Sequence, residues 1–318
     1  MKKRAPLVSV VLPVYNGGGT IEPSIQSILC QTYRNIEVIV VNDGSYDGTH
    51  KICSAINDPR IVYINRPNRG LVSTLNEGLG YCRGSYIARQ DADDISTPQR
   101  IETQVAFMEK NPDHIIVGSF ATRIDAGGNK IGVLRRPRTA EEIFAYLPFQ
   151  SPFIHGSVLF RRSIIDAGMQ YEQYRCSQDY AFWHQILKHG KGYNFCQELY
   201  HYREHDSAIS VTNITEQRKL GHEISLKIMR EYLGEKSHYE RWSFAPFCKN
   251  IKAFSRWERK HFATHARSLA LLFFYKNEWK RGIKESINAQ RLSPHFHDQL
   301  LKISKSLLFA GEAIMIDN

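Results

Sequence analysis

The sequence predicts an α/β fold in which a mostly parallel sheet is flanked by helices and followed by a helical C-terminal extension. Two observations predict the sheet: apolar runs of strand length alternate with helical patterns over residues 7–89, and the links between them are short. A third observation predicts the extension, because the pattern from about residue 212 to the end is helical and basic.

The first strands are recognised by continuous apolar runs, which are typical of strands buried on both faces. The helices between them are recognised by apolar residues that recur on one face. In chain order the expected elements are strand 7–14, a helix carrying Ile21, Ile25, Ile28 and Leu29, strand 36–41, helix 47–56, strand 60–64, helix 71–82 and strand 85–89.

The following residues predict a further helix and a set of shorter strands. Thr97 is expected to cap this helix and Pro98 to occupy its first position, since both residue types suit those places. The run Asp125-Ala126-Gly127-Gly128 is a hairpin signal. Besides the helix with its buried residues Ile101, Val105 and Met108, the expected elements are strands 115–117, 123–124, 131–134, 157–161 and 193–203 and an amphipathic helix over 178–188.

The composition is that of a globular protein in a reducing compartment. Of the 318 residues, 42% are hydrophobic and 23% are charged. Six cysteines are scattered without a Cys-x-x-Cys pair, which argues against a zinc site and a disulfide framework. No apolar window reaches the roughly 18 residues of a membrane span, and the run at 7–14 is expected to be a strand rather than a signal peptide. We therefore expect a cytoplasmic protein.

Positive charge is concentrated toward the C-terminus. The net charge of +10 divides into +3 over residues 1–205 and +7 over residues 206–318. Aromatic and basic residues interleave between residues 238 and 262. They predict either an interfacial helix that holds the protein peripherally at the inner face of the membrane, or a helical cap that packs on the first domain. No recognised nucleic-acid module is present, so nucleic-acid binding is not expected.

Three carboxylates in four residues follow the strand expected at 85–89: Asp91, Asp93 and Asp94. Carboxylates at this spacing repel one another, so a folded protein compensates them with a cation or with hydrogen-bond donors. Hard oxygen ligands suit Mg²⁺ or Mn²⁺, and such ions usually accompany a phosphate. The cluster therefore indicates a metal that holds a nucleotide diphosphate. The alternative is a solvated acidic turn.

Other polar and aromatic residues also lie just past expected strand ends, where ligands bind in open parallel sheets. Pro13 and Tyr15 end the first strand and can wall a base pocket, or they only pack at its rim. Asp43 ends the second strand and can accept the N3–H of a uracil, or it serves only as a turn residue.

Four groups of segments together resemble the family 2 glycosyltransferases, which have the GT-A fold. They are Val8 to Asn16; Gln31-Thr32-Tyr33 with Glu37 to Thr49; Asn68-Arg69-Gly70 with Leu75 to Gly78 and Gly84 to Asp94; and Gln178 to Trp183 with Tyr202 to His205. The resemblance covers about residues 6–210. It implies a catalytic domain over 1–210, with a nucleotide-sugar half at about 1–95 and an acceptor half at about 96–210, and it leaves 211–318 as a basic helical extension.

The resemblance also implies roles in the donor site. Asp43 would contact the base, Asp93 the ribose and Asp94 the metal, which bridges the two phosphates and acts as a Lewis acid. Asp93 is a second candidate metal ligand, and Asp91 would support the cluster by hydrogen bonding. The candidates for positive charge near the phosphates, each with a surface or structural role as the alternative, are Arg66, Arg69 and Arg89.

By the same resemblance the general base is Asp179, at the start of the helix expected over 178–188. An inverting displacement needs this base on the acceptor side, opposite the leaving diphosphate. The alternative is an aspartate that only stabilises the helix N-terminus. Many relatives place Glu before this Asp, whereas Gln178 stands here and leaves the base unassisted. Trp183 is either an acceptor-sugar platform or a core residue.

Arg203 and His205 stand where relatives have Arg-x-His in a loop that closes over the diphosphate. His205 could ligate the metal or donate to a phosphate, with an ordinary surface histidine as the alternative. Ala208 replaces the usual serine of this loop, which leaves its hydroxyl contacts undefined. His155 either lines the sugar pocket or is structural.

These observations predict an inverting glycosyltransferase that depends on Mg²⁺ or Mn²⁺. The expected donor is a UDP-sugar, and the expected acceptor is a hydroxyl of a glycan or of a polyprenyl-diphosphate-linked sugar in surface polysaccharide biosynthesis. One rival is a catalytically inactive nucleotide-binding scaffold, and the presence of Asp93, Asp94 and Asp179 argues against it. The other is a nucleotidyltransferase, but the glycine-rich run over residues 16–20 lacks the cation that a triphosphate loop needs.

Overall fold

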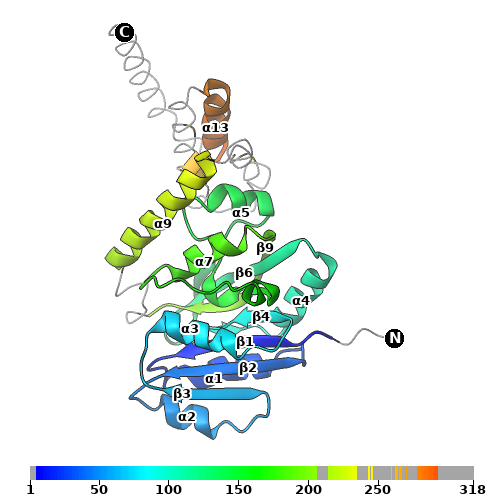
Figure 1. Cartoon of the computed structure of the whole chain (residues 1–318), viewed down its shortest axis with the longest axis vertical. Coiled ribbons are helices and arrows are strands. Elements are labelled where there is room, and N and C mark those ends of the chain that lie inside the picture. The colour runs from blue at the N-terminus through cyan, green and yellow to red at the C-terminus, as the bar shows by residue number, and fades with distance from the viewer. Residues whose placement is uncertain are drawn as a thin grey trace. The chain divides into compact units, whose positions relative to one another are not determined.

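The computed structural model describes residues 5–205, 214–234 and 278–292, together with residues 243, 245, 259, 262, 263, 265, 266 and 270. The chain divides into two compact units, Met1–Ile143 with Gln150–Arg230 and Phe144–Phe149 with Glu231–Asn318. The first unit is an α/β arrangement on one sheet (Figure 1). Along that sheet the strands are β3 (Ile61–Arg66), β2 (Ile36–Asp43), β1 (Val8–Val14), β4 (Tyr86–Arg89), β8 (Leu159–Arg161), β6 (His114–Ile124), β9 (Lys191–Arg203) and β5 (Ile95–Ser96), and β7 (Lys130–Leu134) pairs with β6.

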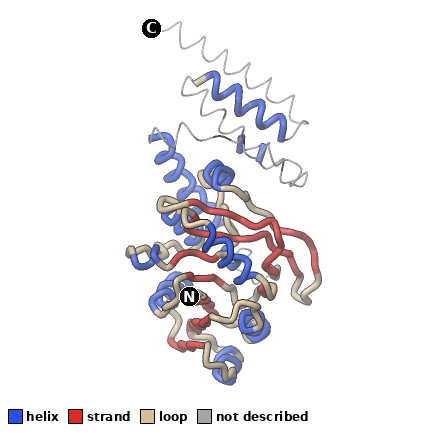
Figure 2. The backbone as a smooth tube through the Cα atoms, turned by 90° about the vertical axis from the view of Figure 1, so that its right-hand side faces the viewer, coloured by secondary structure: helices blue, strands red, loops and turns tan. Residues whose placement is uncertain are grey.

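The strands β3, β2, β1 and β4 form a parallel half of the sheet, as the alternating pattern predicts. Every residue of β1 and β2 is buried. Their continuous apolar runs are required because helices cover both faces (Figure 2). These helices are α1 (Ile21–Leu29), α2 (Thr49–Ala55) and α3 (Leu71–Gly80).

Alternate side chains of β1 belong to two separate cores. Val10 packs in a cluster with Ile25 of α1, whereas Val11 packs in a cluster with Leu75 of α3. Successive side chains of a strand point to opposite faces, so one strand anchors helices on both sides. Each fully buried aliphatic side chain contributes about 1.5–3 kcal/mol, which fixes β1 and the loop after it in the centre of the fold.

The second half of the sheet is mixed. β8 runs antiparallel to both β4 and β6, while β6 runs parallel to β9. The strands predicted at 115–117 and 123–124 are one continuous strand, β6, and the predicted hairpin joins it to β7. The helix predicted over 178–188 is α7 (Gln178–Ile186). Short elements that the sequence pattern did not predict are β5, α5 (Ala140–Tyr146), α6 (Ser163–Asp166) and the 3₁₀ turn η1 (His155–Ser157).

The predicted start of the helix after the acidic cluster is wrong. The helix α4 (Arg100–Lys110) begins three residues after Thr97, and Gln99 occupies the cap position. The backbone N–H and the hydroxyl of Thr97 both donate to the carbonyl of Leu199 in β9, at 3.1 and 3.2 Å. The N–H of Ile101 in the first turn donates to Oε1 of Gln31 at 3.0 Å, so Gln31 supplies the acceptor that the sequence assigned to Thr97. Pro98 lies outside the helix.

The helical prediction for the C-terminal region agrees with α9 (Ile214–Gly234) and α13 (Trp279–Leu292). Most of the aromatic and basic segment 238–262 lies outside the described residues. None of the helices in the described part of the chain combines the length and the apolar character that crossing a membrane requires.

Candidate active site

The predicted donor-site residues lie at one edge of the parallel half of the sheet. Tyr15 directly follows β1, Asp43 and Arg66 are the last residues of β2 and β3, and the acidic cluster Asp91–Asp94 follows β4. Because these strands are adjacent and parallel, their carboxyl ends meet at this edge.

Asp43 is buried and accepts hydrogen bonds from several donors. The backbone N–H groups of Arg69 and Gly70 donate to its two carboxylate oxygens, at 2.8 and 3.0 Å. The guanidinium of Arg66 forms an ion pair with it and a second one with Glu77. Gly70 has φ of +85°, a conformation that favours glycine. Arg66 therefore helps to order Asp43, and its role as a positive charge near the phosphates stays a prediction.

The three carboxylates of the acidic cluster have different surroundings. Asp91 forms an ion pair with the buried guanidinium of Arg89 at 2.6 Å. Asp93 is partly exposed, and its Oδ2 lies 2.8 Å from Nε2 of His205. Asp94 is almost completely buried. Removal from water, followed by repulsion from Asp93 and Asp91, raises the pKa of Asp94 well above its usual value. Removal from water and repulsion from Asp91 also raise the pKa of Asp93.

Two buried residues that the sequence did not single out support this cluster. Arg100 donates to Oε1 of Gln90 at 3.1 Å and to the carbonyl of Arg89 at 2.7 Å, and its guanidinium lies 5.1 Å from the ring centroid of Tyr200. The hydroxyl of Tyr200 in turn accepts from the backbone N–H of Asp91 at 3.1 Å. Arg100 and Arg89 thus place two buried positive charges next to the three carboxylates of the cluster.

Arg203 connects the acidic cluster to the turn between β6 and β7. Its backbone N–H donates to Oδ1 of Asp94 at 2.7 Å, and its Nε donates to the carbonyl of Asp93 at 2.8 Å. The same guanidinium donates to the carbonyls of Asp125 and Ala126. These hydrogen bonds hold the end of β9, and His205 two residues after it, next to the cluster.

Asp179 lies in the first turn of α7, after Ser177 in the left-handed conformation with φ of +60°. Ser151 Oγ donates to its Oδ2 at 3.3 Å. Removal from water raises the pKa of Asp179, although the backbone N–H of Tyr180, the Ser151 hydroxyl and the charge of Arg136 act in the opposite direction. The preceding Gln178 is buried and uncharged, so no second carboxylate adjoins the base at that position.

One short segment, residues 151–157, contacts both Asp179 and the acidic cluster. Ser151 reaches Asp179 at one end of it. At the other end Gly156 packs so closely that a Cβ there would lie 2.6 Å from Oδ2 of Asp91. Between them, Nε2 of His155 lies 3.0 Å from the hydroxyl of Tyr171, and removal from water lowers the pKa of His155 to about 3. The segment therefore carries a histidine with a lowered pKa between the residues that reach Asp179 and Asp91.

Trp183 is a core residue. It is completely buried and makes edge-on contacts with Phe153, His155 and Phe160. An acceptor sugar therefore does not reach its ring, and the platform alternative is wrong for this residue.

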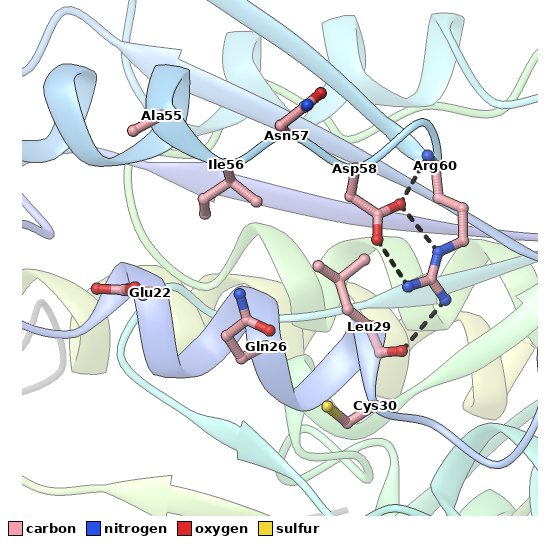
Figure 3. Close-up of a pocket in the computed structure, with 9 residues that line it drawn as sticks. All are labelled: Glu22, Gln26, Leu29, Cys30, Ala55, Ile56, Asn57, Asp58 and Arg60. Atoms are coloured by element: carbon pink, nitrogen blue, oxygen red, sulfur yellow. Dashed lines mark hydrogen bonds and ion pairs between the residues drawn. The ribbon is translucent and has the colours of Figure 1, made fainter.

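A separate hollow of about 410 Å³ lies between α1 and the residues that follow α2 (Figure 3). In its wall the guanidinium of Arg60 pairs with Asp58 at 2.8 Å and donates to the carbonyl of Leu29 at 3.1 Å. The lining, which contains none of the predicted site residues, is Glu22, Gln26, Leu29, Cys30, Ala55, Ile56, Asn57, Asp58 and Arg60.

The chain is similar to glycosyltransferases in sequence and in structure. Residues 9–168 match the model of Glycosyl transferase family 2. A putative glycosyltransferase, EpsE of Bacillus subtilis, is 36% identical over 218 residues, which are 66% of this chain and 77% of that protein. The amylovoran biosynthesis glycosyltransferase AmsE of Erwinia amylovora is 29% identical over 189 residues, 58% of this chain and 71% of that protein.

Solved structures share the fold at low sequence identity. TarS 1-349 of S. aureus in complex with UDP-GlcNAc superposes with a TM-score of 0.56 at 14% identity and covers 89% of this chain and 91% of that chain. A mannosyltransferase from Pyrobaculum calidifontis in complex with GDP-Man and Mn²⁺ gives 0.54 at 19% identity, with 91% and 88% covered.

The sheet, the acidic cluster past β4 and these similarities define a GT-A glycosyltransferase. More specifically, the chain belongs to glycosyl transferase family 2, whose members invert the configuration at the transferred carbon. The fold class and the enzyme class predicted from the sequence are therefore confirmed, while the roles of individual residues stay predictions.

Proposed function

We propose that this enzyme transfers a sugar from a UDP-sugar to a hydroxyl of a glycan or of a polyprenyl-diphosphate-linked sugar during bacterial polysaccharide biosynthesis. The observation that carries the proposal is the gathering of Asp43 and the acidic cluster at one sheet edge, with a separate carboxylate, Asp179, joined to the cluster through residues 151–157. A diphosphate donor needs the first group, and deprotonation of an acceptor needs the second.

The names of similar proteins support this choice of donor and pathway. AmsE is named for amylovoran biosynthesis, and TarS has been solved with UDP-GlcNAc. The archaeal mannosyltransferase has been solved with GDP-Man, so a guanosine donor is the competing possibility that an experiment must separate.

The residues of the cluster suit a divalent cation. The described residues contain no ready-made group of three or more His, Cys, Asp or Glu side chains for a metal. Mg²⁺ is commonly bound by one or two carboxylates together with phosphate oxygens and water, so a complete protein cage is not required. Asp94, Asp93 and His205 would hold the ion here. When bound, it would neutralise the diphosphate that departs as the leaving group.

Asp179 is suited to accept the proton of the acceptor hydroxyl. Its raised pKa makes the ionised carboxylate a stronger base than an exposed aspartate. Ser151 and the N–H of Tyr180 hold the carboxylate in place. The attacking oxygen displaces the diphosphate from the opposite face of the sugar, which inverts the configuration.

The loop after β1 argues against a nucleotidyltransferase. The N–H groups of Asn16, Gly17 and Gly18 donate to the side chains of Ser45, Thr49 and Asp47, at 2.8, 2.9 and 2.9 Å. A triphosphate-binding loop presents such N–H groups to the ligand. In this protein they are already bonded to other side chains, and Asp47 adds a negative charge.

A panel of sugar nucleotides tests the proposal. The purified protein is incubated with Mg²⁺ or Mn²⁺ and UDP-glucose, UDP-galactose, UDP-GlcNAc or GDP-mannose, and the release of UDP or GDP by slow hydrolysis is measured. We expect release from at least one UDP-sugar and its loss on addition of EDTA. Release from GDP-mannose alone contradicts the proposed donor, and release that persists after full chelation removes the metal from the mechanism.

A further inference from the structure

A half-buried arginine near Asp179 has almost no compensation for its charge. Arg136 lies in the segment 135–138, which follows β7. Its Nε is buried and has no hydrogen-bond partner in the described part of the chain, and its Nη1 donates to the carbonyl of Arg135 at 3.0 Å. Among the described residues no carboxylate forms an ion pair with this guanidinium. Buried donors without a partner are costly, so each one calls for an explanation.

Other partly buried arginines of the chain show how such a charge is usually compensated. Arg123 pairs with Glu204 at 2.6 Å, and the side chain of Arg203 donates to three backbone carbonyls. Arg136 has one hydrogen bond to a carbonyl and no carboxylate within the residues that the structure describes. Its remaining donors are therefore available to a molecule that binds to the protein.

The side chain of Asn194 connects the segment of Arg136 to the segment that contacts Asp179. This asparagine is completely buried in β9, and its Nδ2 donates to the carbonyls of Pro137 and Pro152, at 2.6 and 2.9 Å. Pro152 directly follows Ser151, whose hydroxyl donates to Asp179. One amide group thus fixes the backbone beside Arg136 and the backbone beside the partner of Asp179.

The guanidinium of Arg136 acts on Asp179 from a distance. Removal from water raises the pKa of Asp179, and the charge of Arg136 is one of the influences that oppose this rise. In the described structure the two side chains form no ion pair. A direct pair would occupy the carboxylate that has to accept a proton. A guanidinium that stands apart keeps its planar fork of N–H donors, which matches the oxygens of a phosphate or a carboxylate.

We propose that Arg136 binds an anionic group of the acceptor, a phosphate or a carboxylate, next to the hydroxyl that Asp179 deprotonates. The inference rests on the proposed function, because it takes Asp179 as the base. It narrows the acceptor to an anionic molecule. A polyprenyl-diphosphate-linked sugar carries its phosphates one sugar ring away from its hydroxyls, and an acidic glycan carries carboxylates on its rings, so both sources fit this subsite.

Isothermal titration with UDP and excess Mg²⁺ present tests the subsite, because UDP then fills the donor site. The probes are farnesyl diphosphate with farnesol as its neutral counterpart, and methyl glucuronide with methyl glucoside as its neutral counterpart. We expect the wild type to bind one anionic probe about tenfold more tightly than its counterpart, as hydrogen bonds between charged groups allow. Arg136→Gln is expected to lose this preference.

The matched control is Arg135→Gln, which removes the neighbouring charge. Burial acts to raise the pKa of Glu198, but hydrogen bonds and the charges of Lys130 and Arg135 lower it, so the charge of Arg135 acts on a different carboxylate. This variant is expected to keep the preference of the wild type. If Arg136→Gln melts well below the wild type, Arg136→Met takes its place under the same criteria.

The outcomes separate the subsite from the proposed donor. A preference for farnesyl diphosphate identifies a lipid carrier, and a preference for the glucuronide identifies an acidic glycan. If Arg136→Gln keeps the preference, or if the wild type has none, the subsite is wrong and the donor proposal stands. Loss of the preference in both arginine variants shows a general effect of positive charge and also overturns the subsite. A wild type that binds no UDP overturns the proposed donor, and the subsite is then judged by the same titrations without UDP.

Discussion

Asp94 of the acidic cluster and Asp179 both have raised pKa values, but only at Asp94 does repulsion from other carboxylates add to burial. At Asp94 burial acts first, and repulsion from Asp93 and Asp91 adds to it. At Asp179 burial acts against a hydroxyl, a backbone N–H and the charge of Arg136, with no neighbouring carboxylate among the causes. A repelled group is relieved by a cation, whereas a buried single carboxylate is relieved by a proton. The comparison therefore supports the proposal that the cluster holds the metal and that Asp179 accepts the proton.

The largest expected effect is on catalysis by Asp179→Asn. Asparagine keeps the size and an acceptor oxygen for Ser151 but cannot take a proton, so kcat should fall about 10³-fold, within the range of general-base contributions. The dissociation constant of UDP should stay unchanged, since Asp179 is proposed to act on the acceptor hydroxyl and not on the nucleotide. The measurement pairs steady-state transfer with titration of UDP, and Asp166→Asn, an exposed carboxylate in α6, is the control. Turnover at the wild-type rate would remove Asp179 from the role of base.

The second largest effect is expected for Asp94→Asn, on the Mg²⁺ concentration that the enzyme needs for half-maximal activity. Asp94→Asn removes one charge from the three and should raise the Mg²⁺ concentration for half-maximal activity about tenfold or more, since carboxylates are preferred ligands of this ion. Asp179→Asn should leave that concentration unchanged. The comparison is made by titrating Mg²⁺ against residual activity and against the rise in melting temperature that Mg²⁺ with UDP produces. An equal shift in both variants would show that the two regions are not separate.

A third prediction concerns pH and the residue before the base. Asp179 must be ionised to act, so kcat falls as the pH drops below its pKa. Because this pKa is raised, the acidic limb of the plot of kcat against pH lies higher than an exposed aspartate would place it. Gln178→Glu adds a carboxylate beside the base, which raises the pKa of Asp179 further by repulsion. We expect the acidic limb of the kcat profile to move upward by about half a unit to one unit. A limb that stays in place, or moves downward, contradicts the assignment of this limb to Asp179.

Features that depend on local sequence patterns could be predicted, whereas contacts between residues far apart in the sequence could not. The parallel half followed from continuous apolar runs and short links, and the places of Asp43 and the acidic cluster followed from their positions at strand ends. Arg100 and Tyr200 could not be found this way, because their contacts with the cluster join segments as many as 109 residues apart. The cap predicted at Thr97 failed for a similar reason: Oε1 of Gln31, 70 residues away in the sequence, accepts from the N–H of Ile101 in the first turn.

The smallest expected effect is on the stability of Asp179→Asn. The sign of the change in melting temperature shows whether the burial of Asp179 or its hydrogen-bond donors have the larger effect on its pKa. A carboxylate whose pKa is raised on folding contributes stability below its unfolded pKa, and this contribution is lost as the pH rises through the folded value. Above the folded pKa the ionised Asp179 therefore costs the folded protein free energy, and Asp179→Asn should melt a few degrees higher there, as about 1 kcal/mol would produce in a chain of this size. The difference should shrink as the pH is lowered through the folded pKa, which differential scanning fluorimetry can follow. A variant that melts below the wild type at pH 8 would mean that the donors around Asp179 outweigh its burial, and the carboxylate would then be too stable an anion to serve as the base.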